Sequence, residues 1–483
     1  MQLLLLASVS RATPDVGAIL RPEAVVDLAG DRIGEDPAAL HTWIRAFAGD
    51  ETDRGDAWFL EARLQHHALF GGDVEAWYEL GLGETGFDGR LGGPSSPVRL
   101  RIGALRERWG RLDLLPVLDV LNPIDARIGP LVPSQWQRIP IPMAVAQIGS
   151  DKIRSETVLI PFAGADRLWL RETDWSLVRQ GMTASFWNQA AGWEGDDQTE
   201  WINLTQQLAI NSLDLDPSYR RGQDAATNGN SLPQALLVNG EIAQRFELYG
   251  PQFDVAVVAG LLRSSFPQAQ LDDGLRQYLV TQTHPGVVEL VNGELQTADG
   301  ALTYAWPRTF LTGLEASTLI GGLQVRGEGS YTSDQVVRMD YIRSTTVPQI
   351  AAGVGIDYVR GSSLQITLES RWQHLLEVPV APLVLAKADQ IQIAAGLRAG
   401  LMAERLTLQL GGAYDLSFSE LLLRPSLAYR ATDQLQLELG AILLEGFATD
   451  APRTLIDAIT YQGGPVSFWS QNDSLTFAVS WIL

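Results

Sequence analysis

The chain has 483 residues, a formal net charge of −21, 46% hydrophobic residues and a mean hydropathy of +0.01. Nucleic-acid phosphates would be repelled by such an acidic chain, which has no large basic cluster, so the charge argues against nucleic acid as a partner. The absence of cysteine excludes disulfides and thiolate chemistry, and no run of eighteen apolar residues is present for a helical membrane span.

The first residues are similar to the end of a secretion signal. A short apolar run ending at Ala7 is followed by Ser10-Arg11-Ala12, a small-x-small cleavage pattern. We expect residues 1–12 to be the remnant of a signal and the mature chain to begin near Thr13. An ordinary apolar tail is the alternative.

Strands are expected early in the chain. The alternation of apolar and polar residues predicts strands at Val16–Leu28, Trp58–Phe70, Val74–Gly83 and Val98–Trp109. The segment Pro37–Asp50 lacks this alternation and is predicted to be helical or irregular.

After Trp109 the period changes. Residues Arg111–Asn122 are predicted to form a short helix or coil interrupted at Pro116, and a proline-rich run continues to Pro142. Proline lacks an amide donor and would break a strand ladder, so this stretch cannot be a membrane strand. It must lie inside a barrel or beyond one of its rims, and we predict that residues 111–142 form a plug or constriction.

Charged residues of both signs surround this stretch. They are Arg106, Glu107, Arg108, Arg111, Asp113, Asp119, Asp125 and Arg127. Opposed charges across a narrow opening would create a transverse field that screens solutes by charge. The alternative is that these charges pair with one another or with the wall and only anchor the plug, because confined charges need partners.

Two further strands are predicted at Met143–Gly149 and Lys152–Pro161, and a long region without alternation follows, residues 166–232. We expect this insertion to be partly helical. It contains five tryptophans: Trp169, Trp175, Trp187, Trp193 and Trp201. These favour a small self-packed core, with a platform for an apolar ligand as the weaker reading.

The second half of the chain alternates strictly. In the last nine residues Leu475, Phe477, Val479, Trp481 and Leu483 share one face, and the other face is small and polar. Similar segments recur back to about residue 305, each roughly 10 to 14 residues long, as expected for tilted membrane strands. Short connections are predicted near residues 320–322, 361–362, 402–404 and 431–432. Long ones are predicted at about 333–346, 375–388 and 447–472, and the tight link at 417–418 is an exception to this alternation. The sequence predicts an all-β transmembrane antiparallel β-barrel of about 14 strands, with 12 to 18 admissible.

One stretch resembles a known family. Trp109-Gly110-Arg111-Leu112-Asp113 and Asp119-Val120-Leu121-Asn122-Pro123-Ile124-Asp125 are similar to the W-G-x-x-D and D-x-x-N-P-x-D signature of proteobacterial outer-membrane barrels of unknown function. Members are often encoded beside transporters of the resistance-nodulation-division type. The resemblance covers residues 95 to 165, and it implies a porin-like or lipid-handling protein of the Gram-negative outer membrane, with an inner-membrane transporter system as a partner.

No signature of a common active site is present. The sequence has no G-x-S-x-G elbow, phosphate loop or zinc-ligand set. His66 and His67 are adjacent, so in a strand they would point to opposite faces and would not share a metal. The acidic loop 214–230 could bind calcium, but a solvated loop is the favoured reading. No cofactor, metal site or catalytic residue is therefore assigned.

These observations predict a single outer-membrane barrel, residues 13–483, that allows passive passage of a small apolar or amphipathic, lipid-like solute. Its partners would be outer-membrane lipid and that solute. The alternatives are a cation-preferring diffusion porin, a barrel enzyme of the lipase or protease kind, and a soluble all-β binding protein.

Overall fold

The computed structural model describes most of the predicted strand regions. The described residues are 15–28, 38–52, 56–70, 74–92, 96–127, 129, 137–164, 166–167, 240–266, 268–271, 290–291, 294–295, 302–339, 344–378, 383–452 and 461–483. Residues 1–12, the five tryptophans of the predicted insertion and the acidic loop 214–230 lie outside them. Among the described residues, no helix combines the length and the apolar character needed to cross a bilayer.

Strands dominate the described chain. In the first half they are β1 (Asp15–Asp27), β2 (Ala38–Glu51), β3 (Ala57–Phe70), β4 (Val74–Leu82), β5 (Thr85–Arg90), β6 (Val98–Leu105), β7 (Ile141–Gly149), β8 (Ile153–Ile160), β9 (Glu241–Tyr249) and β10 (Phe253–Arg263). Short pairs follow, β11 (Gln268–Leu271) with β14 (Leu302–Ala305) and β12 (Leu290–Val291) with β13 (Glu294–Leu295).

The second half supplies longer strands and a short helix. They are β15 (Arg308–Ile320), β16 (Leu323–Arg338), β17 (Ser344–Arg360), β18 (Leu364–Leu375), β19 (Asp389–Leu401), β20 (Leu406–Asp415), β21 (Glu420–Arg430), β22 (Leu435–Gly446), helix α8 (Pro465–Phe468) and β23 (Ser474–Ile482).

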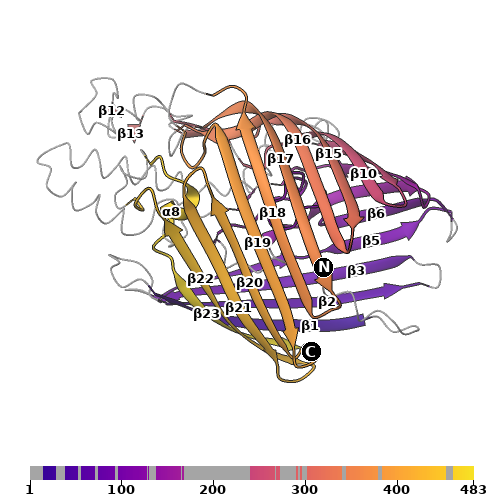
Figure 1. Cartoon of the computed structure of the whole chain (residues 1–483), viewed down its shortest axis with the longest axis horizontal. Coiled ribbons are helices and arrows are strands. Elements are labelled where there is room, and N and C mark those ends of the chain that lie inside the picture. Colours follow the sequence, from indigo (N-terminus) through magenta and orange to yellow (C-terminus); the bar gives the residue numbers. More distant parts are fainter. Residues whose placement is uncertain are drawn as a thin grey trace, which may run out of the picture.

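These strands form one closed antiparallel barrel (Figure 1). Strand β1 pairs with β2 on one side and with β23 on the other, which closes the ring. Strands β4 and β5 both pair with β3, one after the other along its length, and count as one strand of the barrel wall. The barrel described therefore has 18 strands. The predicted all-β antiparallel barrel is therefore confirmed, whereas the predicted number of about 14 strands is too low and 18 is the upper limit of the admitted range.

The segment Pro37–Asp50 contains a strand that the sequence pattern did not predict. It was predicted to be helical or irregular, but β2 pairs along its length with both β1 and β3. Its inward side includes the large apolar Trp43, whereas Ala46 and Ala48 face outward and are small. Apolar character on the two faces is nearly equal, so alternation is weak although the strand is regular.

The two faces of the wall differ sharply. On β15, Leu314 is 52% exposed and its neighbour Glu315 is 0% exposed; on β18, Leu368 is 50% and Glu369 is 1% exposed. Apolar side chains thus point outward and carboxylates inward, as the alternation predicted. No second layer of described residues covers the outward rows, which distinguishes this barrel from two packed sheets.

Tight turns gather at one end of the barrel. Gly321 and Gly322, with φ of +55° and +87°, link β15 to β16 in a conformation that favours glycine. The predicted short links at 361–362, 402–404 and 431–432 are likewise turns. Figure 1 shows α8 at the other end, away from the C terminus. The long link predicted from Ser333 to Thr346 is shorter than expected, because β16 and β17 extend into it.

Candidate functional site

Between β6 and β7 the chain leaves the wall and lies against its inward face. Residues 106–127, here called the inner segment, form no regular helix or strand, only short turns and isolated bridges. Wall glycines allow a close approach. A Cβ atom on Gly313 would lie 2.5 Å from Leu118 Cδ2, and one on Gly353 would lie 2.5 Å from Leu112 Cδ1. The inner segment therefore packs against wall positions at which any side chain larger than that of glycine would collide with it.

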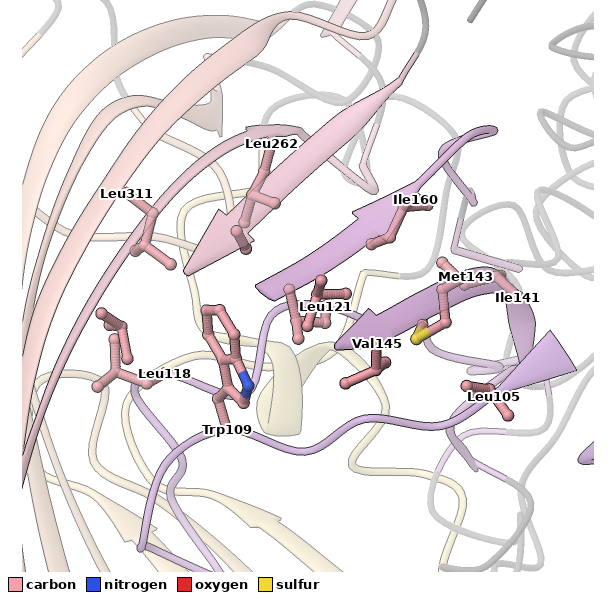
Figure 2. Packing of buried hydrophobic residues seen from close by; sticks show 13 residues of the cluster. Leu105, Trp109, Leu118, Leu121, Ile141, Met143, Val145, Ile160, Leu262 and Leu311 are labelled. Carbon is pink, nitrogen blue, oxygen red and sulfur yellow. The ribbon is translucent and has the colours of Figure 1, made fainter. Parts of the chain in front are cut away.

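One side of the inner segment is apolar and packed. Trp109, Leu118 and Leu121 are at most 3% exposed and belong to one cluster with side chains of β7, β8, β10 and β15 (Figure 2). The Trp109 indole N–H donates to Glu156 Oε1 over 2.6 Å. The one polar atom of this ring therefore has a partner, as burial requires.

A carboxylate on β16 holds the backbone of the inner segment. Glu328 Oε1 accepts the amide N–H groups of Arg111 and Leu112. Its Oε2 accepts those of Val117 at 2.9 Å and Leu118 at 3.1 Å. Irregular backbone has no ladder partner, so these donors would otherwise be unsatisfied at buried positions.

A second carboxylate, on β18, repeats the arrangement. Glu369 accepts the amide N–H groups of Asp113 at 2.7 Å and of Leu114 and Leu115 at 2.8 Å. Arg326 donates to the same carboxylate over 3.0 Å, which balances its charge. The backbone of residues 111–118 is thus fixed by two wall glutamates through charge-assisted hydrogen bonds.

Several of the predicted charged residues pair with the wall or with each other. Arg111 donates to Glu247 over 2.8 Å and to Ser317 over 3.0 Å. Asp119 pairs with Arg138 at 2.7 Å, and its side chain is 7% exposed. Burial raises the pKa of the Asp119 carboxyl, and Arg138 partly opposes this rise.

The two ends of the inner segment are held in the same way. Arg106 pairs with Glu84 at 2.8 Å. Arg127 pairs with Asp125 at 2.7 Å and with Glu79 at 2.6 Å, and these carboxylates raise its pKa against the effect of burial.

Two of the predicted residues are different because they remain half exposed. Arg108 and Asp113 have side chains that are 50% and 47% exposed and pair with each other at 2.8 Å. Asp113 also accepts from Arg326 at 2.7 Å. The other predicted charges of the inner segment are 20% exposed or less.

Three apolar side chains of the inner segment are also partly exposed. Leu114, Val120 and Ile124 are 39%, 41% and 39% exposed. The accessible surface of the inner segment is therefore mixed, with one ion pair and three partly exposed apolar groups. Glu107 lies on the other side, and burial raises the pKa of its carboxyl to about 7 although Arg101 opposes the rise.

The wall residues that hold the inner segment were not found from the sequence. Alternation places Glu328 and Glu369 on the inward face, but many inward residues are charged, and nothing in the pattern selects these two.

The adjacent histidines do point to opposite faces. His66 stacks on Tyr78 with ring centroids 4.5 Å apart, whereas His67 faces inward and lies 2.7 Å from His41, measured between their Nδ1 atoms.

Within the described ranges, no group of three or more His, Cys, Asp or Glu side chains is placed to hold a metal ion. The weak ligand platform predicted from Trp169, Trp175, Trp187, Trp193 and Trp201 lies outside the described residues.

Comparison with known proteins gives structural matches only. No family model and no curated protein matches the chain. Among solved structures, the chain is similar to Pseudomonas aeruginosa OccK8 (OprE), with 10% identity, a TM-score of 0.45, and coverage of 97% of this chain and 98% of that one. Pseudomonas aeruginosa OccK5 (OpdH) matches with 9% identity, a TM-score of 0.44 and the same coverage. Pseudomonas putida OprB matches with 8% identity and a TM-score of 0.34, covering 97% of this chain and 92% of that one.

Proposed function

We propose that this chain is a passive channel of the Gram-negative outer membrane, narrowed by the inner segment, and that it passes small amphipathic solutes. The observation that carries the proposal is the fixing of residues 111–118 to the inward wall by Glu328 and Glu369. Such fixing creates a permanent constriction rather than a plug that must leave.

The outward face supports a membrane location. Leu408, Leu427, Leu439 and Phe477 are registered partners on neighbouring strands and are 39% to 54% exposed. A continuous row of this kind is costly in water and favourable in hydrocarbon. Because the ring is closed, the described wall has no first or last strand with a row of unpaired backbone N–H and C=O groups, and this is also required of a structure within a membrane.

The exposed surface of the inner segment supports the choice of solute. Leu114, Val120 and Ile124 offer contact to an apolar chain, and Arg108 with Asp113 offers contact to a polar head. A path that presents these three apolar side chains and one ion pair suits an amphipathic molecule better than a sugar.

A cation-preferring diffusion porin is the second candidate, favoured by the net charge of −21. Ion selectivity separates the roles of the charges. We expect Asp113→Asn to lower cation preference in planar-bilayer recordings and Arg108→Gln to raise it, because each removes one half-exposed charge of opposite sign. Asp433→Asn, in an exposed turn, is the matched control.

Opposite shifts would support a path lined by this ion pair. Equal shifts in one direction, or none, would contradict it and leave only an anchoring role for the charges. Solute class is tested by uptake into liposomes. Faster entry of a fluorescent fatty acid than of a sugar of similar size supports the amphipathic reading, and a loss of that difference in Val120→Thr would locate it at the constriction. Faster sugar entry would favour the diffusion porin.

A further inference from the structure

The outward face of the barrel carries a polar patch in the middle of its apolar belt. On β9, Gln244 lies between the exposed residues Ile242 and Phe246. On β8, Ser155 and Thr157 lie between the exposed residues Ile153 and Leu159. Among the described strands, His66 on β3, which stacks on Tyr78, is the one other amide, imidazole or charged side chain that faces outward this far from a strand end.

The patch continues as a row across five strands. Ala146, Thr157, Gln244, Ala259 and Thr312 are registered partners on β7, β8, β9, β10 and β15. All five are small or polar. The row Leu408, Leu427, Leu439 and Phe477, on a different part of the ring, is large and apolar throughout. The belt is therefore not uniform, as it would be if lipid alone surrounded it.

The polar groups of the patch interact with each other but keep capacity for a partner. Thr157 Oγ1 donates to Gln244 Oε1 over 2.6 Å, and Gln244 Nε2 donates to Ser155 Oγ over 2.8 Å. A weaker bond runs from Gln244 Nε2 to its neighbour's carbonyl, Arg245 O, at 3.4 Å. The Gln244 oxygen and the Ser155 hydroxyl proton can each form another bond, which hydrocarbon cannot supply.

We propose that this patch meets the same patch on a second copy of the chain, across a symmetry axis of a homo-oligomer. An amide both donates and accepts, so Gln244 can pair with its own equivalent, as a symmetric contact requires. The small side chains of Ala146 and Ala259 allow two walls to approach closely, in the way small residues do between membrane helices. This inference rests on the proposed membrane location but not on the passage of a solute.

The surroundings of the patch fit an interface. Large apolar residues ring it: Ile153, Leu159, Ile242, Phe246, Leu261 and Phe310, each 41% to 56% exposed. Interfaces between soluble proteins usually have an apolar centre and a polar rim, whereas this patch has a polar centre and an apolar rim. In a membrane that order is expected, because the polar groups gain most from leaving lipid.

Cross-linking tests the proposal without a background, because the chain has no cysteine. Thr157→Cys is oxidised in native outer membranes, with Leu439→Cys as the matched outward control. The expected result is a covalent dimer of this chain for Thr157→Cys and none for Leu439→Cys. A Thr157→Cys product containing a different protein, or no product at all, would overturn the proposal.

A steric block provides the second measurement. Ala146→Trp places a large ring in the patch, and Ala395→Trp does the same at an exposed outward position of β19. Mass in detergent solution should fall to that of one chain in Ala146→Trp and stay oligomeric in Ala395→Trp, with heat-modifiable gel migration showing that each barrel is folded. A wild-type chain that is monomeric in both membranes and detergent, or an oligomer that survives Ala146→Trp, would contradict the inference.

Discussion

Replacing Glu328 by glutamine should release the inner segment while leaving the barrel closed. Glutamine keeps the shape of the side chain but presents an NH₂ group where one carboxylate oxygen accepted two backbone N–H groups. Hydrogen bonds to charged groups contribute about 1.5–3 kcal/mol each, so losing two costs about 3–6 kcal/mol. The undocked population of residues 111–118 should therefore rise on the order of a hundredfold or more.

Amide hydrogen exchange measures this population directly. Exchange of residues 111–118 should accelerate in Glu328→Gln, whereas the amides of β16 and β17 should stay protected. Glu445→Gln, at an exposed position near the end of β22, is the matched control and should change neither region. Unchanged protection of residues 111–118 in Glu328→Gln would refute the reasoning that wall carboxylates hold the inner segment.

Three further changes test the packing and the electrostatics of the inner segment. Trp109→Ala removes a buried ring and should destabilise the folded protein by about 3–5 kcal/mol in urea unfolding in detergent; a loss under about 1 kcal/mol would contradict the packing in Figure 2. Gly353→Ala should force Leu112 from the wall at a cost of about 1–3 kcal/mol, and amide hydrogen exchange of residues 111–118 should accelerate. In the control Gly411→Ala the nearest atom is 3.9 Å from the added Cβ, and exchange of residues 111–118 should change little. Burial raises the pKa of Glu107 from 4.5 to about 7, so the folded state holds this proton at higher pH than the unfolded state does. The contribution of Glu107 to stability should therefore be largest below pH 4.5 and should fall between pH 4.5 and 7 by up to about 3 kcal/mol. Urea unfolding of the wild type and of Glu107→Gln at several pH values measures this contribution as the difference between the two proteins; a wild-type protein that gains stability relative to the variant over that range would contradict the raised pKa.

The barrel itself was predictable because strands with an apolar outer face and a polar inner face carry a periodic signal. In β20 and β23 the outward residues are nearly all large and apolar, so the pattern identified these strands and their orientation. β2 escaped notice because its inward face holds Trp43 and its outward face holds alanines. The number of strands was accordingly too low in the first half, where outward residues are often small.

The contacts of the inner segment could not be predicted in the same way. Proline and the change of period showed that residues after Trp109 leave the wall, and the family resemblance marked the same stretch. Which wall residues receive it depends on contacts more than 200 positions apart in sequence, such as those of Glu328 with Leu112 and Val117. Glycines such as Gly353 also matter, and their role appears only when the opposing Leu112 is in place.

Quenching of fluorescent probes placed along β22 tests most directly whether the outward apolar side chains of the barrel face lipid. Single cysteines at Leu437, Glu438 and Leu439 would carry a fluorescent probe in reconstituted vesicles. Brominated lipid should quench the probes at Leu437 and Leu439, and aqueous iodide should quench the probe at Glu438. Equal quenching of all three probes by either agent would contradict a closed barrel with hydrocarbon outside and water within.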